Sequence, residues 1–121
     1  MTFVPDFVNC SAPASMTTID QVANHFVYVK NLIGAEHLCI GADFDGISST
    51  IPGLSDVSDY PALIASLVKK GFTDDEIVGV LGGNILRVME KAEQVSRSMS
   101  NIPPGQAVLT NISGNDCRTV Y

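Results

Sequence analysis

A short apolar run at residues 38–42 limits the folds open to this chain more than any other segment. The run is continuous, contains the β-branched Ile40, and follows closely on a helical pattern, so it predicts a strand buried on both faces. Residues 1–8 are also apolar from the start and predict a strand that Pro5 ends. A strand, a helix and a strand in this order predict a right-handed crossover in a parallel sheet.

The helix between these strands has the clearest local pattern. Thr18 and Gln21 have the spacing of a capping box, apolar residues follow at helical spacing, and Gly34 can end the helix. This pattern predicts a helix over residues 18–33. Two strands are too few for a stable parallel sheet. We therefore expect the chain either to oligomerise or to be part of a larger sheet protein.

The second half of the chain predicts further helices. Pro61 lies in the first turn of one, and Thr73 with Glu76 forms a second capping box. The glycines at residues 82–83 should break this helical stretch, and Asn84 can cap the helix that follows.

The last part of the chain has a different composition. Residues 101–121 contain Pro-Pro-Gly and little periodicity, which indicates an extended tail lying on the surface or on a partner. We predict two parts, residues 1–100 as the folded portion and residues 101–121 as the tail. The 121 residues, 45% of them hydrophobic, suffice for one modest domain with a core. The net charge of −6 argues against a nucleic-acid-binding surface, which would need a basic patch.

Cysteines and asparagines bear on where the protein is located. No C-x-x-C spacing indicates a zinc cluster, and Cys39 is expected to be a buried apolar residue. Cys10 and Cys117 could be disulfide half-cystines if the protein is secreted. Asn9 and Asn111 both fit the glycosylation acceptor pattern, which favours the secretory route. No run is long enough to span a membrane, and the first ten residues lack the pattern of a signal peptide.

Two carboxylates follow the apolar run. Asp43 lies at the carboxyl end of the predicted strand, where parallel α/β folds form their active sites, and Asp45 comes two residues later. Side chains two apart on an extended stretch point the same way, so both could face one site. Gly46 would let the turn approach a ligand closely. The pair could bind a cation or move a proton. Alternatively, both residues merely cap the turn.

The other candidates are weaker. His25 lies inside the first predicted helix, and His37 precedes the predicted strand at its amino end, so neither indicates a ligand or catalytic role. Residues 82–84 read Gly-Gly-Asn, but no Lys follows as in a phosphate-binding loop, which favours a helix break and cap.

Five segments together resemble one known family. Residues 40–46 read Ile-Gly-Ala-Asp-Phe-Asp-Gly and resemble the G-[GS]-D-[FY]-D-G segment of the zinc membrane dipeptidases (renal dipeptidase type, peptidase family M19). Residues 2–7 are similar to the family's N-F-V-P-x-F, residues 59–63 to its Y-P-x-L helix start, and residues 82–88 to its G-x-N-x-L-R-V segment. Residues 117–121 are similar to the C-R-T-x-Y tail of animal members.

The resemblance implies a fold and a cofactor. The implied fold is α/β, the C-terminal portion of a TIM-type (β/α)8 barrel with two strands, about four helices and an extended tail. Family members bind two zinc ions through a His-x-Asp pair, a bridging Glu and two later His residues, all upstream of the matched segments. Neither His25 nor His37 matches a ligand position, so no metal ligand is expected within this chain.

One active-site residue of the family maps onto this chain, Asp43. In the mechanism that the resemblance implies, two zinc ions lower the pKa of a bridging water and polarise the scissile carbonyl of a dipeptide. Asp43 would orient that water and pass its proton to the leaving amine. Asp45 and Gly46 are expected to support the loop or the substrate.

The resemblance also bears on partners and location. Cys10 matches a family cysteine whose partner would lie upstream, so it is expected to be unpaired here. Cys117 resembles a tail cysteine that links subunits in some animal members, which implies a possible homodimer. The parent protein would be membrane-associated or extracellular.

Three hypotheses about function remain open. The first is a C-terminal fragment of a zinc dipeptidase that is inactive alone because the metal ligands are missing. The second is a non-catalytic partial-barrel module that binds a partner or dimerises. The third is a small cation site made by the carboxylates of Asp43 and Asp45.

Overall fold

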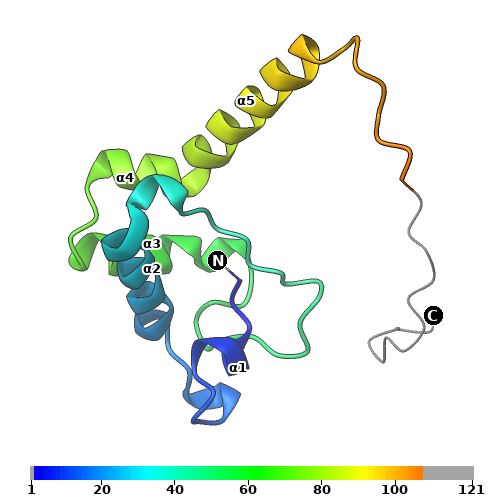
Figure 1. The fold of residues 1–121 in the computed structure, drawn as a ribbon. Coiled ribbons are helices and arrows are strands. Elements are labelled where there is room, and N and C mark those ends of the chain that lie inside the picture. Colours follow the sequence, from blue (N-terminus) through cyan, green and yellow to red (C-terminus); the bar gives the residue numbers. More distant parts are fainter. Residues whose placement is uncertain (1, 108–121) are drawn as a thin grey trace.

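The computed structural model describes residues 2–107, and these residues form helices joined by extended segments (Figure 1). Five α-helices occur in this part of the chain: α1 (Pro5–Val8), α2 (Ile19–Ile33), α3 (Tyr60–Lys69), α4 (Asp74–Val78) and α5 (Asn84–Ser98). Short 3-10 turns stand at Ala14–Met16, Ala35–His37 and Val57–Asp59, and a π-helical segment at Gly79–Gly83 joins α4 to α5.

Helix α2 forms as its sequence predicts. Thr18 is the N-cap, its hydroxyl accepts a hydrogen bond from the backbone N–H of Gln21, and the Gln21 side chain accepts one from the backbone N–H of Thr18. Gly34 ends the helix with φ of 99°, a conformation that favours glycine. The predicted helix over residues 18–33 is confirmed.

The helices of the second half follow the predicted order. Pro61 lies in the first turn of α3, and Gly71, with φ of 86°, follows the end of that helix. Thr73 and Glu76 form the predicted capping box at the start of α4. Asp59 does not cap α3 with its side chain, because its carboxylate instead accepts a hydrogen bond from the backbone N–H of Ser55 at 2.7 Å.

The core lies between α2 and α3 and extends under the loop that precedes α3. One salt bridge joins Lys70, at the end of α3, to Asp20 in α2 at 2.7 Å, and a second joins Lys30 in α2 to Glu76 in α4 at 2.6 Å. The fully buried side chains include Phe3, Val22, Phe26, Ile51, Leu54, Leu63 and Leu67.

The two predicted strands are not present in the described residues, so the predicted sheet of a (β/α)8 barrel portion is wrong for this structure. A strand needs a neighbour that pairs with it over several residues. Residues 38–43 are not helical, but their bonds to backbone distant in the sequence are isolated, from Ile40 N–H to Val80 O at 3.4 Å and from Phe3 N–H to Ala42 O at 3.2 Å. Pro5 opens helix α1 instead of ending a strand.

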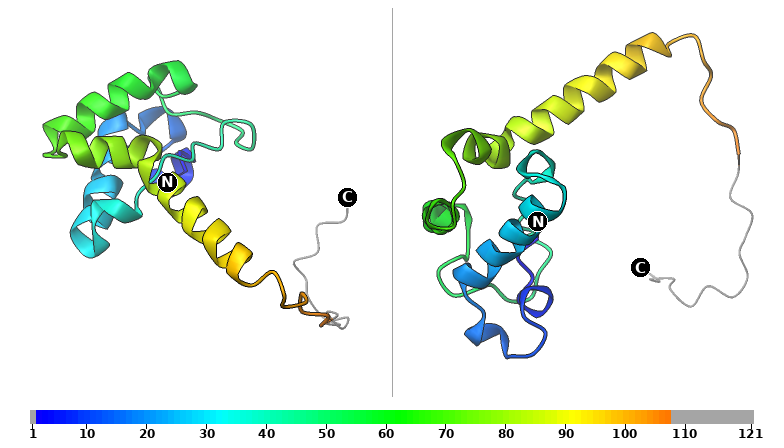
Figure 2. Two further views of the ribbon diagram at one scale, coloured as in Figure 1. Left: turned by 90° about the horizontal axis from the view of Figure 1, so that it is seen from above. Right: turned by 60° about the vertical axis from the view of Figure 1, so that its left-hand side comes forward.

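Helix α5 stands apart from the rest of the described chain. Figures 1 and 2 show it projecting away from the other helices in each view. Of its residues only Asn84 is buried. Residues 101–107, the first part of the predicted tail, contain no helix or strand, and residues 108–121 lie outside the described residues.

Candidate functional site

The turn at residues 43–46 presents Asp43 to solvent. The backbone N–H of Gly46 donates to the carbonyl oxygen of Asp43 at 3.0 Å, which closes the turn without the carboxylate. Asp43 has φ of 66°, a left-handed conformation that Asp and Asn tolerate better than most residues. Among the described residues, no hydrogen bond or ion pair uses the Asp43 carboxylate. The turn therefore does not depend on this side chain as a cap.

Gly46 lies against the side chain of Asp43, and its predicted close approach to a ligand stays a prediction. A Cβ atom at this position would lie 2.5 Å from Oδ1 of Asp43, closer than real atoms approach. The Asp43 carboxylate therefore lies directly against the Gly46 backbone. Gly46 provides the space that this position of the carboxylate requires.

An aromatic cluster fixes the residue between the two carboxylates. The ring of Phe44 packs 6.1 Å from that of Phe3 and 6.2 Å from that of Tyr60, and Phe3 and Tyr60 lie 6.3 Å apart. Phe3 is fully buried, and the other two rings pack against the core. Because Phe44 turns inward, its neighbours Asp43 and Asp45 are both exposed. The cluster joins residues from three of the five segments that resemble the family.

An open pocket of about 290 Å³ lies beside this turn. Residues 4–7 line one side of it, and Asp43, Gly46 and residues 47–49 line the other. Asp45 does not line this pocket, because residues 44–46 form a turn and not the extended stretch that would point both carboxylates the same way. The structure thus brings Asp43 and Gly46 together at the pocket but leaves Asp45 outside it.

A second carboxylate reaches the pocket from the other side. Asp6, in the first turn of α1, is exposed and lines the pocket together with Asp43. The sequence did not indicate this residue, because a strand over residues 1–8 would not have folded Asp6 against a distant turn. The one available signal was Pro5, which is common at the first position of a helix.

The described residues do not form a metal site. They contain no group of three or more His, Cys, Asp or Glu side chains placed to hold one ion. Asp6 and Asp43 alone provide fewer protein ligands than a zinc site needs. The donor set in this part of the chain therefore does not fit zinc.

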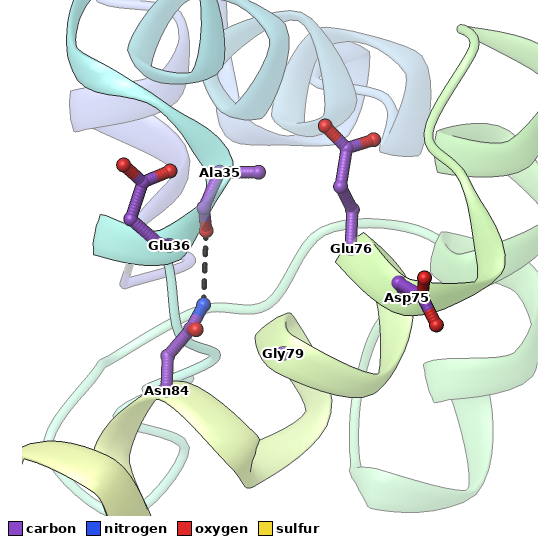
Figure 3. Close-up of a pocket in the computed structure, with 6 residues that line it drawn as sticks. All are labelled: Ala35, Glu36, Asp75, Glu76, Gly79 and Asn84. Atoms are coloured by element: carbon purple, nitrogen blue, oxygen red, sulfur yellow. Dashed lines mark hydrogen bonds between the residues drawn. The ribbon is translucent and has the colours of Figure 1, made fainter.

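A second set of polar contacts holds the segment that leads to Asp43. The amide nitrogen of Asn84 donates to the carbonyl oxygen of Ala35 at 2.9 Å (Figure 3) and to that of Leu38 at 2.8 Å. A guanidinium nitrogen of Arg87 donates to the carbonyl oxygen of Glu36 at 2.7 Å. The prediction that Asn84 caps α5 is wrong, because its side chain makes no cap hydrogen bond and Gly83 is the N-cap.

An open pocket of about 210 Å³ lies next to these contacts, with Glu36, Asp75 and Glu76 among its lining residues (Figure 3). Glu76 has its pKa lowered by the salt bridge to Lys30, and then by the backbone N–H of Thr73. These contacts connect Glu76 to the capping box of α4 and to α2, so its carboxylate has a structural role.

Neither the two histidines nor the two described cysteines line the pocket beside Asp43. His25 Nε2 is 3.0 Å from the carbonyl oxygen of Val8, which ties α2 to the end of α1. His37 is exposed in the turn that precedes residues 38–43. Cys10 is exposed, and Cys39 is half-buried where full burial was expected. Cys117 and Asn111 lie outside the described residues.

Within the described part of the chain, none of the helices combines the length and the apolar composition that a membrane span requires. This finding concerns residues 2–107 and agrees with the absence of a long apolar run in the sequence.

Comparison with known proteins identifies the relatives of this chain. Dipeptidase aclJ of Aspergillus oryzae is 46% identical over 100 residues, which cover 83% of this chain and 24% of the relative. Dipeptidase verJ of Clonostachys rogersoniana is 44% identical over 97 residues, 80% of this chain and 25% of the relative. Dipeptidase tcpJ of Claviceps purpurea is 34% identical over 104 residues, 86% of this chain and 24% of the relative. The chain thus spans about a quarter of the length of these relatives.

A family model gives the same result over most of the chain. The model described as membrane dipeptidase (peptidase family M19) matches residues 1–103. The match includes the aromatic cluster, the turn at Asp43 and the whole of α5. The resemblance seen in the motifs is confirmed, and the chain belongs to the membrane dipeptidase family, peptidase family M19.

Proposed function

We propose that this chain is the part of a zinc-dependent dipeptidase that carries the catalytic acid Asp43. The observation behind the proposal is the exposed carboxylate of Asp43 at the pocket, in a turn that the backbone and Phe44 hold without its help. A carboxylate at such a position can take a proton from an attacking water and pass it to a leaving amine. Hydrolysis of the peptide bond of a dipeptide requires both transfers.

The chain alone is proposed to be inactive. Its sequence has only two histidines, and neither lies at the pocket beside Asp43. The donor set of the described residues does not fit zinc, so the metal that makes the nucleophile would be held by residues outside this chain. What this chain contributes is the carboxylate and the framework that positions it.

A dipeptidase assay tests both statements. The full-length protein should release amino acids from dipeptides in a zinc-dependent reaction, and the 121-residue chain should not. Asp43→Asn keeps the shape of the side chain and suits φ of 66°, so it should fold normally and lower kcat of the full-length protein by 100-fold or more, on the order expected for a lost general acid–base. Activity of the purified short chain, or full activity of the Asn variant, would contradict the proposal.

Two further proposals concern the location of the parent protein and the covalent pairing of its subunits. We propose that the parent protein follows the secretory route, with Asn9 as a glycan acceptor, and that Cys117 links two subunits. Asn9 is half-buried, and its side-chain oxygen accepts a hydrogen bond from Ser11 N–H at 3.2 Å. Treatment with a glycosidase and electrophoresis without reductant would test these statements, with Asn9→Gln and Cys117→Ser as the matched variants.

One observation favours a second candidate, a non-catalytic module that binds a partner or dimerises. Helix α5 exposes large apolar side chains, among them Leu86 (66% exposed) and Met89 (53% exposed). Sedimentation of the purified chain distinguishes the two candidates. A folded dimer, together with a full-length protein that never hydrolyses dipeptides, would favour the module.

A further inference from the structure

The junction between α4 and α5 holds the backbone that runs toward Asp43. Asn84 is buried, and the nitrogen of its side-chain amide has two hydrogens, which it donates to two carbonyl oxygens, those of Ala35 and Leu38. Arg87, one helical turn further along α5, donates to the carbonyl between them, that of Glu36. Three donors from one helix face therefore bind three carbonyls of residues 35–38, as Figure 3 shows for Ala35.

The carbonyl of Leu38 needs a partner because residues 38–43 form no ladder in the described structure, whereas the carbonyl of Ala35 also accepts from the backbone N–H of Leu38 at 3.1 Å. Buried backbone groups without a partner cost about 1–3 kcal/mol each. Three hydrogen bonds hold the segment 38–43 along its length. At its start the Asn84 amide donates to the carbonyl oxygen of Leu38, and in its middle Ile40 N–H donates to the carbonyl oxygen of Val80. At its end the N–H of Phe3 donates to the carbonyl oxygen of Ala42. Asp43 follows directly after the last of these bonds.

The close packing at the junction also indicates that the Asn84 side chain has a fixed place there. A Cβ atom on Gly79 would lie 3.0 Å from both side-chain end atoms of Asn84, so the glycine leaves just enough room for this amide. A residue with a shorter side chain would lose both hydrogen bonds.

We propose that Asn84 and Arg87 are positioning residues for Asp43, which fix the start of the segment whose end presents the carboxylate at the pocket. The inference rests on the proposed function of Asp43. Neither residue lines the pocket beside Asp43, so each acts through the backbone of residues 35–43 and not by contact with a substrate.

Kinetics of the full-length protein test the proposal. Arg87→Gln removes one exposed donor, and Asn84→Asp replaces the amide donor with an acceptor of the same size. Each should lower kcat by roughly 10- to 100-fold with a smaller change in KM, as expected when a catalytic group moves by about 1 Å. Arg97→Gln is the matched control on the same helix, because Arg97 bonds only to the exposed Glu93 among the described residues, and it should leave kcat unchanged.

A double-mutant cycle separates positioning from general destabilisation. If Asn84 and Arg87 act through Asp43, their variants should cause no further loss of kcat in a protein that already carries Asp43→Asn. An equal fold-loss in both backgrounds would overturn the inference, and so would unchanged kcat in folded Arg87→Gln and Asn84→Asp. Full activity of Asp43→Asn alone would instead refute the proposed function.

Hydrogen exchange gives a readout that does not depend on activity. Arg87→Gln, the variant at an exposed site, should speed exchange of the amides in residues 38–46 and leave the amides of α2 unchanged. The hydrogen exchange of Arg87→Gln decides the outcome if Asn84→Asp fails to fold or if the Asp43→Asn variant is too slow to assay. Faster exchange throughout α2 and residues 38–46 alike, or no change in residues 38–46, would overturn the inference.

Discussion

The packed body of the molecule is the part built around the core between α2 and α3. Its helices and helix α5 are amphipathic, but they differ in what covers their apolar faces. In the body, α2 and α3 bury side chains such as Phe26 and Leu67 completely. On α5 the apolar side chains are about half exposed or more, from Ile85 at 46% to Leu86 at 66%. The comparison shows that an amphipathic pattern determines which face of a helix is apolar, whereas its burial requires a partner surface.

The two regions meet at few points. Asn84 and Arg87 join α5 to residues 35–38, and the π-helical segment joins it to α4. A helix of 15 residues is marginal in water when it packs against nothing. The stability of the body therefore depends on buried apolar area, and that of α5 depends on its junction with the body.

The largest effect is expected in the body. Phe26→Ala removes a fully buried ring from α2 and should lower the free energy of unfolding by about 3–5 kcal/mol. Urea unfolding followed by circular dichroism would measure the loss. Tyr28→Ala is the matched control, because Tyr28 is an aromatic residue of the same helix that is 65% exposed, and it should cost about 0.5 kcal/mol or less. Equal losses would mean that the exposed side of α2 is covered in solution.

A smaller effect is expected at the start of α2. Thr18→Ala removes the side-chain oxygen that accepts from Gln21 N–H and should cost about 1 kcal/mol. The same unfolding experiment measures it, with Thr50→Ala, in an exposed loop, as the control. A loss no larger than that of the control would show that the cap does not hold α2 in place.

The salt bridge between α2 and α4 predicts a pH dependence. Lys30 and Thr73 hold the pKa of Glu76 below its ordinary value, so the folded state binds this proton less tightly than the unfolded state. The resulting stability is present above the ordinary glutamate pKa, about 4.3, and is lost as the pH falls through the lowered pKa. The effect should be smaller than that of the cap, because water screens two partners with side chains 24% and 26% exposed.

Glu76→Gln is the variant that checks this pH dependence. Its stability should fall less than that of the wild type as the pH is lowered from above the ordinary glutamate pKa, about 4.3, through the lowered pKa of Glu76. Glu93→Gln, at an exposed site on α5, serves as the control and should behave like the wild type. Parallel curves for Glu76→Gln and the wild type would contradict the prediction.

The smallest effect is expected on α5. Leu86→Gln replaces an exposed apolar side chain and should change the free energy of unfolding by about 0.5 kcal/mol or less. Leu63→Gln in α3, where the side chain is fully buried, provides the contrast in the body. A large and concentration-dependent loss for Leu86→Gln would show that a second copy covers this face in solution, which would favour the dimerising module.

Local patterns predicted helices α2 to α5 and the capped starts of α2 and α4 correctly, but not helix α1. The capping boxes at Thr18 and Thr73 close within three residues, so the sequence contains every group that they need. The motif at residues 40–46 identified Asp43 and its family in the same way, because the order of residues is itself the signal. Asp43 as the catalytic residue stays a prediction that the experiments above test.

The sheet could not be predicted from local patterns. Residues 38–42 have the composition of a buried strand, but a strand exists only where another segment pairs with it, and the described residues provide single hydrogen bonds in place of a ladder. Asn84 shows the same limit, because its type and position suit a helix cap, whereas its amide binds carbonyls nearly fifty residues away along the chain.

The sequence by itself determined helices α2 to α5 and the family, because each depends on residues close together in the chain, and it marked Asp43 as the candidate acid that the experiments above test. Only the tertiary structure decided that Phe3, Phe44 and Tyr60 form one cluster, that Asp6 reaches the pocket of Asp43, and that Asn84 binds backbone instead of capping a helix. The physical reason is that these contacts join distant segments, and their formation depends on which surfaces the packed body buries.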